Sequence, residues 1–155
     1  MPIAAVGQQR SPEYPYIPLI MWSKILLMKN VVFFLGLGTL FTHELDAISS
    51  YEWRLLPILR SLPDQMGMTI FVLIHIPLFA VIVALVASSD SHTRSLSRIV
   101  LGGFLILHAT LHLWFSSDPN YGFISSISNW LIFGGAGFGA IYLAFIYREY
   151  RISNE

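Results

Sequence analysis

The sequence predicts an all-α integral membrane protein whose four transmembrane helices form a bundle. Of its 155 residues, 55% are hydrophobic and only 12% are charged. Soluble domains carry about 25% charged residues, so this composition suits lipid rather than water. Four apolar stretches also come close to the roughly 20 residues that a helix needs to cross a bilayer. An even number of spans places both termini on the same side of the membrane.

Three parts are expected along the chain. Residues 1–24 are expected to form a loosely ordered leader and interfacial segment, because the first 18 residues include four prolines and contain no long apolar run. The four-helix transmembrane domain covers residues 25–147, and residues 148–155 form a short cytoplasmic tail. The four spans lie at about 25–48, 67–88, 99–116 and 127–147.

The basic residues indicate the orientation, because Lys and Arg accumulate in cytoplasmic segments. Arg54 and Arg60 lie in the first loop. The other seven flank the termini and the second loop: Arg10, Lys24, Lys29, Arg94, Arg98, Arg148 and Arg151. The N and C termini are therefore expected in the cytoplasm, with loops one and three outside. The four tryptophans support this orientation as an aromatic belt, with Trp22 at the inner boundary and Trp53, Trp114 and Trp130 at the outer one.

The first loop contains an amphipathic stretch, Tyr51–Leu56 followed by Ile58 and Leu59. We expect a short helix on the outer surface, broken at Pro57 and Pro63. It either covers a site that opens at this surface or serves as a connector with apolar anchors.

Ionisable side chains inside the spans are the feature that points to function, since lipid makes each of them costly unless it is partnered. A rise of 1.5 Å per residue places His43 roughly 9 Å below the outer boundary and His112 roughly 6 Å below it. His75 and His108 both lie at roughly 12 Å. The histidines therefore converge in the outer half of the bundle.

This convergence predicts a metal site. His108 and His112 are four residues apart, so they share one helix face and can bind one ion together. His43 and Asp46 are three apart and also share a face. Zinc, iron or manganese suits such a set. The predicted ligands are His43, Asp46, His75, His108 and His112.

Two glutamates are candidates for catalysis. Glu44 lies about 100° round the helix from His43, so it faces a neighbouring helix, the loop or the outer shell of the site. Glu52 lies in the first loop. Either can act as general base toward a metal-bound water.

Two alternatives stay open. Haem b held between His75 and His108 would make the chain an electron-transfer subunit, although carboxylates beside haem ligands are unusual. A polar network that only joins the helices would make the cluster structural. The balanced charge argues against a nucleic-acid partner, which needs a basic face. The glycines at positions 134–139 fit helix packing rather than a nucleotide loop, because no strand precedes them.

At His43-Glu44-Leu45-Asp46-Ala47, followed by Glu52-Trp53-Arg54, the chain resembles a family of small bacterial membrane proteins known only as a domain of unknown function. The resemblance covers about residues 30–147, including the pair formed by His108 and His112. It implies a four-helix fold and a bacterial origin, and no activity. More distantly, the layout is similar to that of intramembrane zinc hydrolases acting on lipids, an analogy of site and not of fold.

These observations together favour a metal-binding multi-pass protein of the bacterial inner membrane. We expect a metal-dependent enzyme, either a hydrolase or an oxidoreductase, acting on a lipid-soluble substrate at the outer leaflet. The expected partners are the lipid bilayer and such a small molecule, with a homo-oligomer or a larger membrane complex as further options.

Overall fold

The computed structural model describes residues 19–154, with side chains from residue 23 onward. Within this part the chain forms α1 (Leu19–Ser49), α2 (Asp64–Val86), α3 (Ser91–Phe115) and α4 (Ser126–Asn154). All four are long and apolar enough to cross a membrane, which confirms the predicted fold class. The expected leader falls largely on residues 1–18, outside the described residues.

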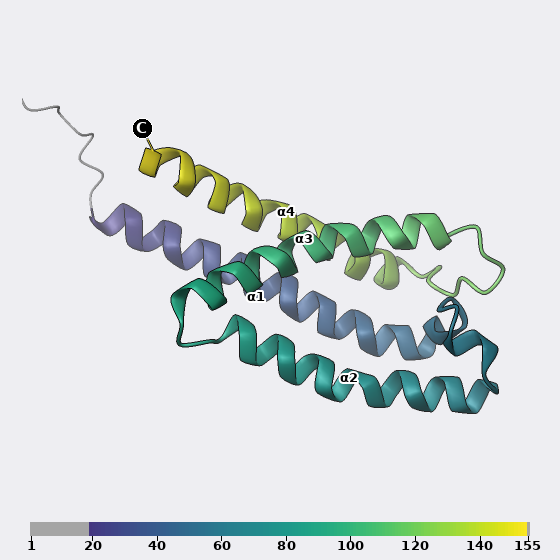
Figure 1. Ribbon diagram of the computed structural model, residues 1–155. Coiled ribbons are helices and arrows are strands. Elements are labelled where there is room, and N and C mark those ends of the chain that lie inside the picture. Colours follow the sequence, from purple (N-terminus) through teal and green to yellow (C-terminus); the bar gives the residue numbers. More distant parts are fainter. Residues whose placement is uncertain (1–18, 155) are drawn as a thin grey trace, which may run out of the picture.

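The helices alternate in direction, so α1 begins and α4 ends at the same end of the bundle (Figure 1). We call this the terminal end; the short α2–α3 connection, residues 87–90, also lies there. The opposite end, here the loop end, carries the connections 50–63 and 116–125. Six of the seven basic residues that indicated one side of the membrane belong to the terminal end; the seventh, Arg10, is outside the described residues.

Helix boundaries differ from the expected spans where polar residues continue a helix beyond the apolar stretch. α3 begins at Ser91, eight residues before the expected span, because the Asp90 side chain accepts a hydrogen bond from the Thr93 backbone N–H (2.6 Å) and caps the helix. α4 likewise runs on through most of the expected tail to Asn154. The length of the apolar stretch predicts how much of a helix lies in the lipid, whereas the helix itself can continue beyond that stretch into water.

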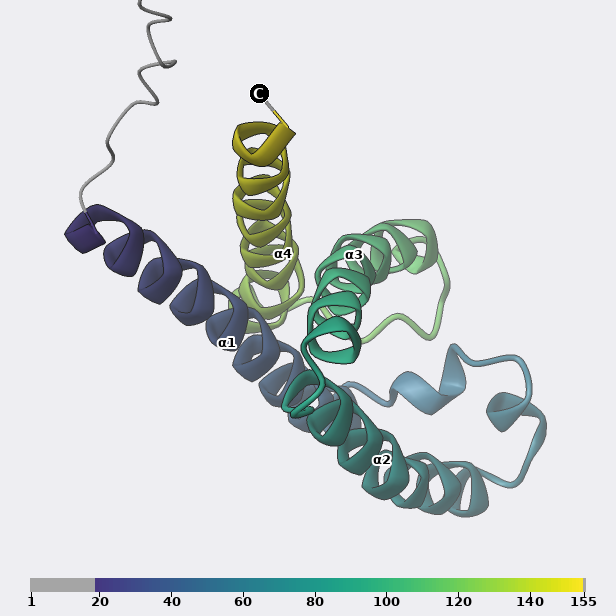
Figure 2. The same cartoon turned by 60° about the vertical axis from the view of Figure 1, so that its left-hand side comes forward.

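Three helices form the compact part of the bundle. α1 and α3 both pack along α4, and α2 packs mainly against α3 and the first loop, on the side away from α4 (Figure 2). Gly139 on α4 makes the closest approach: a Cβ there would lie 2.5 Å from the Gly102 carbonyl oxygen of α3. Small residues at this crossing let the two backbones meet, as expected for helix packing in a membrane.

Two apolar clusters fill the interior. One lies toward the terminal end and includes Phe33, Leu37, Leu101, Leu105 and Tyr142. The other lies toward the loop end and includes Ala47, Trp53, Phe71, Ala109 and Phe123. The second cluster draws side chains from both loops, so the loops are part of the packed structure at that end.

The first loop folds inward rather than lying on the surface as one helix. It forms two 3-10 turns, Glu52–Arg54 and Leu59–Ser61. Trp53 is buried and donates its indole N–H to Asp64 (3.0 Å), the first residue of α2. Trp53 therefore does not join the expected aromatic belt, whereas Trp114 and Trp130 are 81% and 61% exposed and remain available to it.

Candidate metal centre

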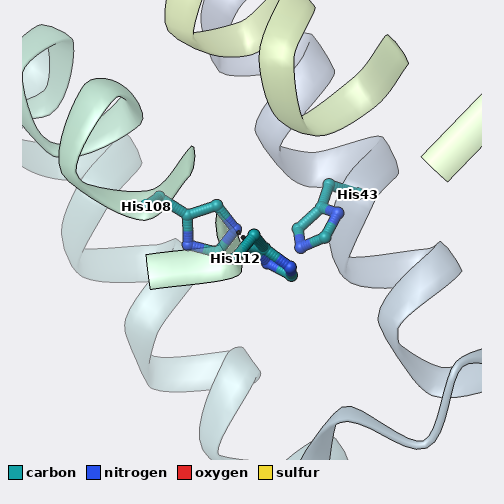
Figure 3. Close-up of side chains that lie close together, drawn as sticks. All are labelled: His43, His108 and His112. Atoms are coloured by element: carbon teal, nitrogen blue, oxygen red, sulfur yellow. Dashed lines mark hydrogen bonds between the residues drawn. The ribbon is translucent and has the colours of Figure 1, made fainter. Parts of the chain in front are cut away.

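Three of the predicted histidine ligands come together near the loop end. His43 is on α1, and His108 and His112 lie one turn apart on α3. Each offers one ring nitrogen, and these three atoms lie within 4.8 Å of one another. Figure 3 shows the three rings gathered around a common centre. The helical rise predicted this convergence, and the fold brings it about by packing α1 and α3 on the same neighbour, α4.

The ring orientations suit a shared ion. The three ring centroids are 4.6 to 4.9 Å apart, and the planes stand at 64° to 86° to one another, so the rings meet edge-on rather than stacked. Nitrogens around a tetrahedral zinc lie about 3.3 Å apart, given Zn–N bonds of about 2.0 Å. The Nε2 atoms of His108 and His112, 3.1 Å apart, match that spacing, whereas the full set of three nitrogens spans up to 4.8 Å and would have to contract around an ion.

The third loop holds His112 in its orientation. The Nδ1 atom of His112 is 3.3 Å from the Tyr121 hydroxyl, and its Nε2 atom forms a 3.1 Å hydrogen bond with Nε2 of His108, so one of these two nitrogens carries the proton. A partner on one ring nitrogen that aims the other at the metal is the usual arrangement of histidine ligands. The loop can supply Tyr121 because Gly122 next to it crosses the Ser50 carbonyl so closely that a Cβ would lie 2.4 Å from its oxygen.

His43 is the most deeply buried member of the cluster. Its side chain is 1% exposed, and the Phe123 ring stacks on it at a centroid distance of 5.1 Å. Neither of its ring nitrogens has a hydrogen-bond partner. A neutral imidazole carries one N–H and one lone pair, so this burial leaves both a donor and an acceptor unsatisfied at a cost of roughly 1–3 kcal/mol each.

Glu52 lies at the edge of the cluster. The first 3-10 turn directs its carboxylate inward, and Oε2 is 3.7 Å from Nε2 of His43 without a hydrogen-bond partner. Burial raises the pKa of Glu52 to about 8, and the neighbouring carboxylates of Glu44 and Asp46 raise it as well. At neutral pH this carboxyl group therefore holds a proton unless a cation takes its place.

Glu44 and His75 form a separate pair between α1 and α2. The His75 Nδ1 atom is 2.6 Å from the Phe71 carbonyl oxygen, which can only accept, so Nδ1 carries a proton. Its Nε2 atom lies 2.9 Å from Oε2 of Glu44. A proton must lie between these two atoms as well, whether it belongs to the imidazole or to the carboxyl group. The pair thus shares a proton inside the bundle.

Both groups of side chains line one cavity of about 650 Å³ between α2, α3 and the first loop. Most of its wall is apolar, including Ile74, Leu111 and Phe115. Its ionisable members are Glu44, Glu52, His75, His108 and His112. Phe123 covers one side of the histidine cluster, and His108 and His112 face this cavity on another.

The five predicted ligands therefore occupy three places. His43, His108 and His112 form the cluster, and His75 lies across the cavity with Glu44. Asp46 is half-buried, one of its carboxylate oxygens has no partner, and it lies outside the histidine group. Tyr121 and Phe123 touch the cluster from the third loop. The rise per residue of a helix does not apply to a loop, so it could not predict the depth of these two residues in the membrane.

The fold and the site together define a four-helix, multi-pass membrane protein with a buried histidine group able to hold a metal ion. The chain belongs to a family of unknown function, DUF6713, which matches residues 29–149. The matched region includes all of α2 and α3, most of α1 and α4 and every member of the cluster, which confirms the resemblance at the level of the family. No curated protein and no solved structure matches the chain.

Proposed function

We propose that this protein is a metal-dependent membrane enzyme, a hydrolase or an oxidoreductase, acting on a lipid-soluble substrate. His43, His108 and His112 hold a divalent zinc, iron or manganese ion. Glu52, whose carboxylate is 3.7 Å from His43, and Asp46, three residues after His43 on α1, are the carboxylates proposed to complete or tune the ligand set, and the proton shared by Glu44 and His75 serves the reaction. His75 can join the ligand set only if its pairing with Glu44 rearranges.

The observation that carries this proposal is the unsatisfied burial of His43 beside two other imidazoles. A purely structural polar network stabilises a bundle by satisfying its members with hydrogen bonds. Here both ring nitrogens of His43 and one oxygen of Glu52 have no partner. An ion bound among the three histidines would take up the lone pair of His43 and would replace the hydrogen bond that joins His108 and His112.

The chemistry follows from the donor set and its surroundings. Three neutral imidazoles do not reduce the positive charge of a bound ion, and they leave at least one coordination position open. Such an ion can supply a nucleophilic water at neutral pH or bind a redox-active substrate. Glu44 and His75, across the same cavity, can give or take a proton at the substrate. The apolar walls exclude bulk water and suit a substrate that is dissolved in the bilayer.

The orientation is part of the proposal. The basic residues at the terminal end favour a cytoplasmic location for that end, which puts the cavity in the outer half of the membrane. For a bacterial protein this is the periplasmic leaflet of the inner membrane. A reporter fused after Glu155 that is active only outside the cytoplasm would reverse this assignment.

Metal analysis of the purified protein tests the proposal. We expect stoichiometric zinc, iron or manganese in the detergent-solubilised protein and its loss in the His108→Ala/His112→Ala double variant. His92→Ala is the matched control, because His92 is an exposed histidine at the far end of the same helix. Circular dichroism establishes that each variant is folded.

Three results would count against the proposal. Equal metal content in the double variant and the control would place the metal elsewhere. A folded wild-type protein with no metal after growth in metal-supplemented medium would favour a structural network. A Soret absorption band would show that the protein binds haem, so the histidines would be haem ligands and not ligands of a single metal ion.

A further inference from the structure

The cavity at the histidine cluster continues along the bundle as an apolar groove between α2 and α3. A second hollow of about 430 Å³ shares Glu44, Leu78 and Phe104 with the first. It extends toward the terminal end as far as Val86 and Ser97. Its remaining walls are hydrocarbon side chains, among them Leu40, Phe79, Ile82, Leu96, Val100 and Leu101.

The two hollows differ in chemistry. The one at the loop end contains two carboxyl groups and three imidazoles, whereas Glu44 and Ser97 are the polar side chains that line the other, with Glu44 at their junction. From Ile70 to Val86 the groove follows 17 residues of α2, a rise of about 24 Å at 1.5 Å per residue. This length approaches the roughly 30 Å thickness of the hydrocarbon core.

The helix on one side of the groove is only lightly held. α2 is the most apolar of the four helices and the least buried. Toward α1 it is attached by the Glu44–His75 pair and by the tilted contact of Phe41 with Phe79, 4.4 Å between centroids. The wall of the groove therefore faces the bilayer along its length, and a molecule can enter sideways without passing through water.

From this arrangement we propose that the groove binds the hydrocarbon chain of an amphiphilic substrate and places its polar group between His108 and the Glu44–His75 pair. The chain runs along α2 toward Val86, and the head stays at the loop end. This proposal rests on the proposed function, which it deepens by naming the substrate class: a membrane lipid with a long chain and a polar group that reacts at the head.

A mixed surface of this kind selects its occupant. A transmembrane helix from a partner or a second copy would bury the apolar wall, but it would also need an ionisable side chain at the depth of Glu44 and His75, which is costly in lipid. An amphiphile satisfies both parts of the groove at once. Burial of each methylene group is worth about 0.8 kcal/mol relative to water, but a chain taken from the bilayer gains far less, so the head must supply most of the specificity.

Photo-crosslinking in vesicles tests the proposal. The full-length protein is reconstituted in phosphatidylethanolamine and phosphatidylglycerol vesicles containing a trace of a phospholipid with a diazirine in its acyl chain. After irradiation, labelled positions are mapped by mass spectrometry. We expect several-fold more label on groove residues than on residues of equal depth on the lipid-facing sides of α1 and α4.

Two matched variants separate groove binding from bulk lipid contact. Val100→Trp fills the groove, whereas Val83→Trp adds the same side chain to an exposed position on α2 that does not line it. We expect the first to reduce groove labelling several-fold and the second to leave it unchanged. The metal content of both should match the wild type, because neither residue touches the histidines.

The outcomes are distinct. Labelling no stronger in the groove than elsewhere, or unaffected by Val100→Trp, would overturn the proposal in favour of ordinary bilayer lipid. Crosslinks from the groove to a second protein chain would overturn it in favour of a helix as occupant. If the groove is labelled but the protein contains no metal, the proposed lipid-binding site is supported and the proposed metal-dependent function is wrong.

Discussion

The two ends of this bundle differ in whether their buried polar groups have hydrogen-bond or ion-pair partners. At the terminal end Lys29 pairs with Glu149 at 2.6 Å, and Arg98 donates to the Val86 carbonyl and to Asn30. At the loop end His43 and Glu52 are buried with polar atoms that have no partner. All such unpartnered atoms in the described residues lie at the loop end.

The difference separates a structural use of polar residues from a functional one. Satisfied groups at the terminal end hold the helices in position. Unsatisfied groups at the loop end cost stability, and they lie where an ion or a substrate can satisfy them. Five changes to the molecule test this contrast, and the one expected to cost the most stability lies where α3 crosses α4.

The close crossing of α3 and α4 should tolerate the least change. Gly139→Ala places a Cβ 2.5 Å from the Gly102 carbonyl oxygen, so the helices must separate, and we expect a loss of about 3 kcal/mol in unfolding free energy. Unfolding in mixed micelles with increasing dodecyl sulfate measures it. Gly137→Ala is the control, since its Cβ would meet nothing within 4 Å. Equal losses in both variants would show that the crossing is not tight.

Removing the Tyr121 hydroxyl should weaken the metal site without dismantling it. Tyr121→Phe deletes the partner of His112 Nδ1 at 3.3 Å, so the ring is free to turn away from its neighbours. Loss of such an orienting contact costs about 10–100-fold in metal affinity. Competition with a chelator measures the change, and Tyr147→Phe, at an exposed position on α4, is the control. An unchanged affinity would remove Tyr121 from the site.

Helical periodicity explains what could be predicted before the structure and what could not. The four spans and the grouping of His43 with His108 and His112 follow from hydropathy and a fixed rise per residue, since both depend only on local geometry. The position of Tyr121 depends on a loop path, which Gly122 permits and no periodicity encodes. Likewise, spacing put His75 at the right depth but could not show that it faces Glu44.

The sign of a stability change should differ between the two ends. His43→Leu replaces an unsatisfied buried imidazole by an apolar side chain of similar length, so the metal-free protein should gain about 1 kcal/mol while losing its metal. Phe33→Leu, equally buried in the apolar cluster at the terminal end, should lose about 1 kcal/mol. Both are measured on chelator-treated protein. Destabilisation of the metal-free protein by His43→Leu would make the cluster structural.

The ion pairs should contribute least. A double-mutant cycle with Lys29→Met and Glu149→Gln should give a coupling of about 1 kcal/mol or less, since these side chains are 14% and 32% exposed. The more exposed pair of Arg54 with Asp64 is the fifth change; Arg54→Met should leave the unfolding midpoint unchanged. Raising the salt concentration should reduce the first coupling only partly, because partial burial limits screening. A coupling abolished by salt would mean that Lys29 and Glu149 meet in water, and that this pair does not help to hold α1 against α4.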